Sequence, residues 1–368
     1  MTTKRLIHAS LSAAATLAFA FAPAMAATAS NDTTGADSDN DAKVNIENDI
    51  TILQQNELYV QNNIYVDVNT GDNSANKNTG DGTVKTGDAD VKKIDVSTSG
   101  NSNKLSLESN GSGDYSASNE TTGFDSDNDA KVKVDNDVDV TQKNKAKVYN
   151  NIDIDVNTGG NDADKNTGDG SVDTGDADVD VMVTNDLNSN ELEIDGLGTV
   201  GDLSASNKET GAKSDNFAKV KIVNDVDVLQ GNRLNVHNDV DVDVNTGDNS
   251  ADKNTGDGSV DTGDADIDVE ISTKGNSNDA TVDAGVAGDF DTSNETTGFD
   301  SDNDAVVKVD NDVDVTQKNK ANVDNHGDID ADTGNNDADK NTGDGDVDTG
   351  DSDVDVEVDT DVNSNNLD

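Results

Sequence analysis

Short, regularly spaced groups of aspartates are the residues of this chain with the clearest chemical potential. The segment DSDND places Asp125, Asp127 and Asp129 at alternate positions, as in the first half of an EF-hand calcium loop. Ala130 stands where that loop needs glycine and Asn136 where it needs a bidentate glutamate, so an EF-hand is excluded. The carboxylates could still chelate a hard cation. The group recurs as Asp37, Asp39 and Asp41 and as Asp300, Asp302 and Asp304, and it is replaced in a third copy by Lys213, Asp215 and Phe217.

A second acidic pattern is the stretch DKNTGDGSVDTGDADVD at 164–180, which returns almost unchanged at 252–268 and as variants at 76–92 and 339–355. A phosphate-binding loop is excluded, because no lysine follows the glycines and no apolar strand leads into a helix. Glycines 168, 170 and 175 are expected to turn the chain, with Val172 and Val179 pointing inward. The aspartates are candidate ligands for a divalent cation, calcium first: Asp169, Asp173, Asp176 and Asp178, and Asp257, Asp261, Asp264 and Asp266.

Catalytic chemistry has little support in the sequence. Beyond residue 26 the chain has two histidines, His237 and His326, which lie in equivalent regions of different repeats. Paired carboxylates occur throughout and therefore mark no site, and no distinctive constellation stands outside the repeat pattern. We expect that the protein is not an enzyme.

The acidic patterns are positioned by a period of about 88 residues. TTGADSDNDAKV at 33 returns as TTGFDSDNDAKV at 121, ETGAKSDNFAKV at 209 and TTGFDSDNDAVV at 296. A fixed period of this kind is typical of stacked repeats. The repeats are 33–120, 121–208, 209–295 and a truncated 296–368, after a short lead at 27–32. Smaller echoes inside each repeat predict several coils of irregular length per repeat.

The local pattern predicts β-strands. Between Val132 and Val156, β-branched residues and amides alternate with aspartate, lysine and asparagine, which is a period of two. A strand this long is unusual, so turns are expected at the segments TQKN (141–144) and YNN (149–151). Two interpretations of the inward amides remain open, a hydrogen-bonded ladder between coils or exposure at corners. The amides are Asn136, Gln142, Asn144 and Asn150.

Composition narrows the function further. The 368 residues carry a formal net charge of −53, with no cysteine or tryptophan, and the single proline precedes residue 27. Disulfides are therefore absent, and the charge opposes binding to nucleic acid or to anionic membranes. In a parallel stack, Asp135, Asp137 and Asp139 are expected to approach Asp153 and Asp155 of a following coil. Cations or high salt would then be needed to relieve the repulsion.

The N-terminus indicates export. Lys4 and Arg5 precede an apolar run at 11–22, and the residues Ala24, Met25 and Ala26 form a small-x-small cleavage site. This arrangement is typical of a Sec-type signal peptide of residues 1–26. The mature chain is therefore expected to be secreted or at the cell surface, without inserting into a membrane.

Three resemblances extend this interpretation. TGDGSVDTGDADVDV is similar to the turns of calcium-binding β-roll repeats, although Thr167 and Thr174 are seven apart and no Gly-Gly precedes them. That resemblance implies calcium shared by aspartates of adjacent turns. NTGDNSANKNTGDGTVKTGDADV resembles secreted bacterial Asn/Thr/Gly-rich β-strand repeat proteins of surface layers, adhesins and fibres. TQKNKAKVYNN is loosely similar to curlin repeats. Together they imply an extracellular structural role.

We therefore predict an elongated, all-β parallel solenoid that forms a fibre, surface layer or adhesin stalk. Divalent cations or high salt would stabilise it, and copies would stack head to tail because no sequence resembling a cap covers either end. Two alternatives remain open. One is a monomeric β-roll module that binds calcium, mineral or ice, and the other is a disordered acidic polymer that buffers cations.

Overall fold

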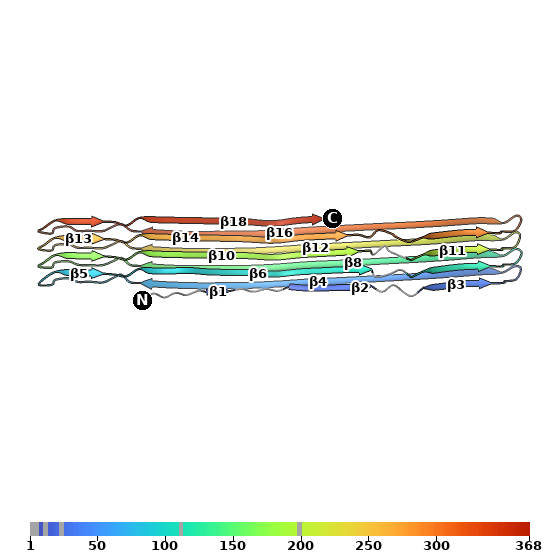
Figure 1. The fold of residues 1–368 in the computed structure, drawn as a ribbon, viewed down its shortest axis with the longest axis horizontal. Helices are drawn as coiled ribbons and strands as arrows, with labels where there is room; N and C mark the ends of the chain where they lie inside the picture. The colour runs from blue at the N-terminus through green and yellow to red at the C-terminus, as the bar shows by residue number, and fades with distance from the viewer. Residues whose placement is uncertain (1–6, 10–13, 22–25, 110–112, 197–200) are drawn as a thin grey trace.

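The fold is a stack of β-strand rungs. The computed structural model describes residues 7–9, 14–21, 26–109, 113–196 and 201–368, and every regular element in them is a strand. Figure 1 shows four rungs lying one on another, with the N-terminus at one side of the stack and the C-terminus at the other. The prediction of an all-β parallel solenoid is confirmed. The expectation of several coils per repeat is wrong, because each period forms one rung whose strands pair with residues 87 or 88 positions away.

One wall of the stack consists of four long strands of 31 residues each. They pair in parallel and without a register shift in the order of the chain, and they are β4 (Asp39–Asn69), β8 (Asp127–Asn157), β12 (Asp215–Asn245) and β16 (Asp302–Asp332). The turns expected at 141–144 and 149–151 are therefore wrong. The stretch from Val132 to Val156 has no glycine or proline to break it, and β8 is paired along its whole length on both edges.

The facing wall is built from three shorter strands per rung, which Figure 1 shows end to end opposite the long strand. The first rung comprises β3 (Ala27–Asp32), β4, β5 (Gly82–Lys85) and β6 (Ala89–Ser109). The second comprises β7 (Tyr115–Glu120), β8, β9 (Gly170–Asp173) and β10 (Ala177–Asp195). The third comprises β11 (Leu203–Lys208), β12, β13 (Gly258–Asp261) and β14 (Ala265–Val282), and the fourth comprises β15 (Phe290–Glu295), β16, β17 (Gly345–Asp348) and β18 (Ser352–Leu367). We use this rung numbering below.

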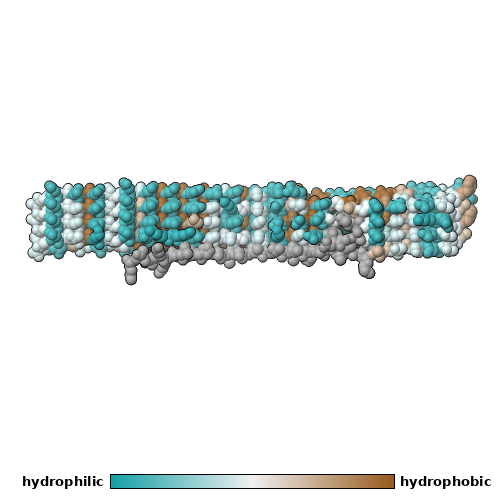
Figure 2. Space-filling view, in the orientation of Figure 1, coloured by the Kyte–Doolittle hydropathy of each residue, from teal (hydrophilic) through white to brown (hydrophobic). Residues whose placement is uncertain are grey.

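The core is a thin apolar layer between the two walls. Alternate residues of β8 are buried, including Val132, Val148 and Ile152, while the residues between them face outward. The predicted inward positions Val172 and Val179 are also buried. Because stacked rungs repeat the same residue types, Figure 2 shows hydropathy as bands that cross the long axis of the molecule.

Amide ladders run through this core. Asn136 Nδ2 donates to Asn224 Oδ1 at 2.7 Å, and Gln142 Nε2 donates to Gln54 Oε1 at 2.8 Å. Asn144 and Asn150 make the same contact with the third rung. All four amides are buried, so the ladder interpretation is confirmed and the corner interpretation is wrong. Each ladder satisfies polar groups that would otherwise be costly to bury.

The described residues of the predicted signal peptide, 7–9 and 14–21, lie against the first rung. Strands β1 (Ile7–Ala9) and β2 (Ala14–Phe21) pair in parallel with β6, where a preceding rung would lie. Residues 22–25, and with them most of the predicted cleavage site, lie outside the described residues. The first rung itself begins at Ala27, immediately after the predicted signal peptide.

Candidate functional site

The DSDND aspartates lie at the turn into the long strand in the first, second and fourth rungs. Asp125 lies in the turn with a left-handed φ of 57°, Asp127 begins β8, and Asp129 forms an ion pair with Lys131. Asp37 and Asp300 occupy the same left-handed position in the first and fourth rungs, with φ of 54° and 58°. A short aspartate tolerates this conformation, so the turn alone gives a reason for the residue type. The remaining members, Asp39, Asp41, Asp302 and Asp304, continue the columns of Asp127 and Asp129.

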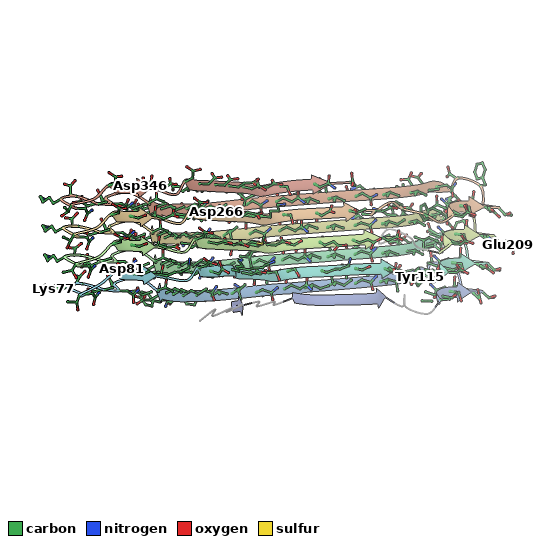
Figure 3. All side chains as sticks on the ribbon, turned by 60° about the vertical axis from the view of Figure 1, so that its left-hand side comes forward. Lys77, Asp81, Tyr115, Glu209, Asp266 and Asp346 are labelled. Carbon is green, nitrogen blue, oxygen red and sulfur yellow. The ribbon has the colours of Figure 1, made fainter. Side chains whose placement is uncertain are left out.

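The aspartates of the glycine-rich turns bind backbone amides of neighbouring rungs. Asp169 Oδ1 accepts the N–H of Asp257 at 2.9 Å, and Asp176 Oδ1 accepts the N–H of Asp264 at 3.0 Å. Asp257 and Asp264 in turn accept an N–H from the fourth rung. Figure 3 shows this turn end of the molecule, where Lys77 and Asp81 lie. These four carboxylates therefore connect the turns of neighbouring rungs by hydrogen bonds, whether or not they also bind a cation.

The other predicted ligands lie on strands. Asp173 ends β9 and pairs with Lys85 at 2.5 Å, and Asp178 of β10 lies 3.5 Å from Lys92 Nζ. Asp261 and Asp266 occupy the equivalent positions in the third rung. Among the described residues, no three histidine, cysteine, aspartate or glutamate side chains are grouped so that they could hold one metal ion. The predicted ligands thus lie in columns that run from rung to rung.

The outer face of the long-strand wall concentrates acidic charge. Between the second and third rungs, five aspartate pairs stack directly on one another: Asp127–Asp215, Asp137–Asp225, Asp139–Asp227, Asp153–Asp241 and Asp155–Asp243. The stacking expected between Asp135–Asp139 and Asp153–Asp155 is wrong, because stacked residues are a full rung apart. Burial, and then the neighbouring aspartates, raise the pKa values of Asp137, Asp155, Asp225 and Asp243.

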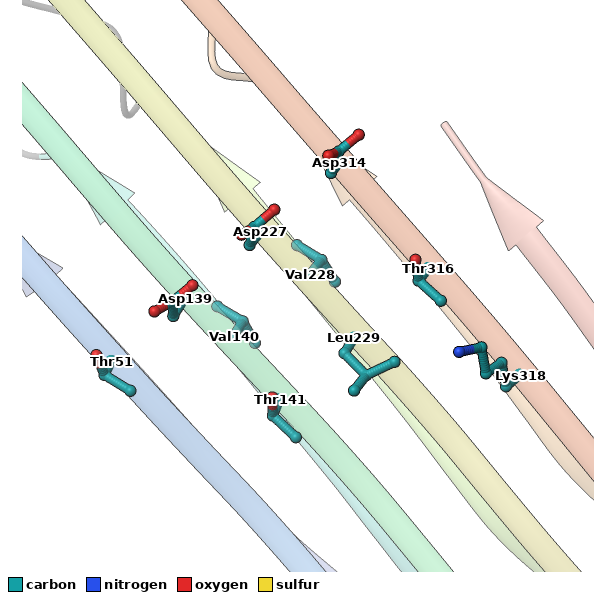
Figure 4. A pocket seen from close by; sticks show the side chains of 10 residues that line it. All are labelled: Thr51, Asp139, Val140, Thr141, Asp227, Val228, Leu229, Asp314, Thr316 and Lys318. Carbon is teal, nitrogen blue, oxygen red and sulfur yellow. The ribbon is translucent and has the colours of Figure 1, made fainter.

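A shallow hollow interrupts this acidic face. Figure 4 shows the column Asp139, Asp227 and Asp314 along one side and Thr141, Leu229 and Thr316 along the other. Lys318 lies at the fourth rung. The period of 88 and 87 residues could have predicted these columns. They were missed because stacking was expected between coils of the same repeat. The hollow presents carboxylate and hydroxyl oxygens, which are ligands that hard cations prefer.

The two ends of the stack form a second kind of candidate site. In the fourth rung, Val307 is 44% exposed, whereas Val132 and Val220 of the same column are at most 1% exposed. Val269 and Ile271 lie with Ile329 and Val356 around an opening of the core at this end. β16, β17 and β18 are the last strands of their sheets, and β4 and β5 are the first strands of theirs. Each end thus presents strand edges without a partner among the described residues.

No family model, curated protein or solved structure matches this chain. Within the described residues, no helix is long and apolar enough to span a membrane.

Proposed function

We propose that this chain is an exported, acidic structural protein whose copies stack head to tail into an extracellular fibre, surface layer or adhesin stalk. The observation that carries the proposal is the end of the stack. The fourth rung has the same kind of apolar and amide columns as the interior rungs, but its valines are exposed and the outer edges of its strands have no partner in the described part of the chain. An exposed parallel edge pairs readily with another chain, and a heterologous contact of this kind produces filaments.

The predicted signal peptide supports export, and its removal would determine when copies begin to stack. In the full chain, β1 and β2 occupy the edge of β6 that a neighbouring copy would use. Removal of residues 1–26 frees that edge, so stacking would begin only after the signal peptide has been cleaved.

Cations are the proposed stabilising partners. The five stacked aspartate pairs between the second and third rungs repel one another, and divalent cations, calcium first, or high salt would reduce that repulsion. The same columns favour a second candidate function, a monomeric module that binds calcium along its acidic face. The two functions differ in whether the ends are used.

The test compares two purified chains, residues 27–368 and residues 1–368, across a concentration series with and without calcium. Sedimentation velocity and negative-stain microscopy report assembly. The proposal predicts filaments from the shorter chain and far fewer from the longer one. A chain of residues 27–368 that stays monomeric at high concentration with calcium present would refute the fibre and leave the monomeric module.

A further inference from the structure

The rungs alternate between two types in their core residues. One column of the long-strand wall reads Leu58, Ala146, Leu234 and Ala321, and a column of the facing wall reads Gly100, Leu187, Gly275 and Val362. Residues of both columns pack in one apolar cluster. The first and third rungs thus combine a leucine on the long strand with a glycine opposite, whereas the second and fourth rungs combine an alanine on the long strand with a leucine or valine opposite.

Close packing within a rung explains why the two columns vary together. A side-chain carbon added to Gly275 would lie 1.9 Å from the carbonyl oxygen of Leu187 in the rung below, so only glycine fits at that height. Leu234 of the same rung supplies apolar volume from the other wall. Within each rung, the larger residue on one wall therefore fills the volume that the smaller residue opposite leaves.

Other columns alternate in step with this pair. Along the long strands, the inward columns read Ile46, Val134, Ile222, Val309 and Val66, Ile154, Val242, Ile329. At the turn before the long strand, the residues are Ala36, Phe124, Ala212 and Phe299. The first rung is of one type and the fourth of the other. A fourth rung placed on the first rung of another copy therefore brings together the same two rung types as the contact between the second and third rungs.

Side-chain ladders give the stack a direction. Asn128 Nδ2 donates toward the third rung, to Asn216 Oδ1 at 2.9 Å, and Asn188 Nδ2 donates in the same direction to Asn276 Oδ1 at 2.9 Å. The asparagine columns therefore end on donors at the fourth rung and on acceptors at the first rung, whereas the buried glutamine column runs the opposite way, with Gln317 donating to Gln230 and Gln142 to Gln54. One of the asparagine acceptors at the first rung, Asn101 Oδ1, is buried and has no hydrogen-bond donor in the described chain.

The turn carboxylates and the surface charges of the fourth rung are complementary to those of the first rung. The N–H of Asp344 donates to Asp257 Oδ1 of the third rung, so the carboxylate of Asp344 is the open acceptor at the end of its column. The matching backbone N–H at the other end belongs to Asp81, which begins the column. Glu57 of the first rung already pairs with Lys145 at 2.5 Å, and the equivalent residue of the fourth rung is Lys320.

We propose that the fourth rung of one copy seats on the first rung of a second copy with a single polarity and register, in which β16 continues onto β4 and β18 onto β6. This inference depends on the head-to-tail assembly proposed above and specifies its contact. Asn363 then donates to Asn101 Oδ1 of the next copy, Lys320 faces its Glu57, and Ala321 faces its Leu58. Contacts between two first rungs or two fourth rungs would instead place donor against donor or acceptor against acceptor.

Engineered cysteines test the register directly, because the chain has no cysteine of its own. Lys318 and Gln55 are exposed, outward and in one column, so the pair Lys318→Cys with Gln55→Cys in the 27–368 chain places the two Cα atoms about 4.8 Å apart across the contact. The off-register control pairs Lys318→Cys with Gln61→Cys, about 20 Å along the strand. Each single variant reports contacts between identical ends, and Gln55→Cys with Lys143→Cys is the positive control within one copy.

Under mild oxidation, the in-register pair should give a ladder of covalent oligomers that reductant reverses. The yield of cross-linked oligomers should be at least tenfold above that of the off-register control and of either single variant. Dimers from either single variant would overturn the polarity, and a ladder from the off-register control would overturn the register. Filaments that form without any cross-link in the in-register pair would also overturn the inference while leaving the proposed function intact. If neither filaments nor cross-links form, the proposed function fails together with the inference.

Discussion

Replacement of Asn128 by alanine tests whether the amide ladders hold the rungs together. Asn128 is fully buried and connects two other buried amides, since Asn40 Nδ2 donates to its Oδ1 at 2.8 Å and its own Nδ2 donates to Asn216 Oδ1 at 2.9 Å. Asn128→Ala removes both contacts and leaves the neighbouring apolar columns in place.

The expected cost follows from the two amides that remain. Asn216 Oδ1 loses the donor that the structure gives it, while Asn40 Nδ2 keeps a contact with Ser38 Oγ at 3.0 Å. A buried polar group left without a partner costs about 1–3 kcal/mol. With partial compensation at Asn40, we expect Asn128→Ala to lower the free energy of unfolding by about 2–4 kcal/mol.

Chemical and thermal unfolding followed by circular dichroism measures this loss. Asn151→Ala is the matched control, because Asn151 lies outward on the same strand and is exposed, and its effect should stay within about 0.5 kcal/mol. Valine at all four positions of the ladder, Asn40, Asn128, Asn216 and Asn303, removes every partner at once and should cost less than the single change. Equal stability of Asn128→Ala and Asn151→Ala would refute the reasoning.

Three further predictions concern charge and packing. Burial and neighbouring carboxylates raise the pKa values of Asp137 and Asp225, so at these groups the folded chain binds more protons than the unfolded chain. The melting temperature should therefore rise as the pH falls from neutrality through those raised pKa values, and level off below about pH 4. A steady fall of the melting temperature over that range would contradict this prediction. Sodium chloride should raise the melting temperature by screening the acidic face, and calcium at equal ionic strength should raise it further if the columns bind the ion; no response to either would contradict the proposed role of cations. Gly275→Ala should lower the free energy of unfolding in urea by at least about 2 kcal/mol, because Gly275 has φ of 140° and the added carbon would meet the Leu187 carbonyl oxygen. Gly35→Ala is the control and should have a small effect, since no atom lies within 4 Å of the added carbon.

The fold class could be predicted from periodicity, whereas the size of a rung could not. Alternation from Val132 to Val156 predicted strands, and the repeated segments predicted stacking. The expectation that strands are short then led to turns inside that stretch. The stronger signal was the absence of glycine and proline, together with in-register repetition at the full period, which makes one repeat equal to one rung.

The candidate site was only partly accessible to sequence reasoning. The pattern identified Asp169 and Asp176 as carboxylates in turns, but their hydrogen bonds to amides of the next rung depend on backbone positions that no spacing reveals. The amide ladder was one of two interpretations of Asn136 and Gln142, because their ladder partners lie 88 positions away in the chain and the sequence alone does not place them in contact. The alternation of Leu58 and Ala146 could be explained only by the structure, which places Gly100 and Leu187 opposite them.

Fibre diffraction from aligned assemblies of residues 27–368 tests the central claim most directly. Head-to-tail stacking predicts a strong reflection at about 4.8 Å along the filament axis, with an axial repeat of about 19 Å for four rungs. Filaments whose strands run along the axis, or the absence of any ordered axial spacing, would contradict the proposed assembly.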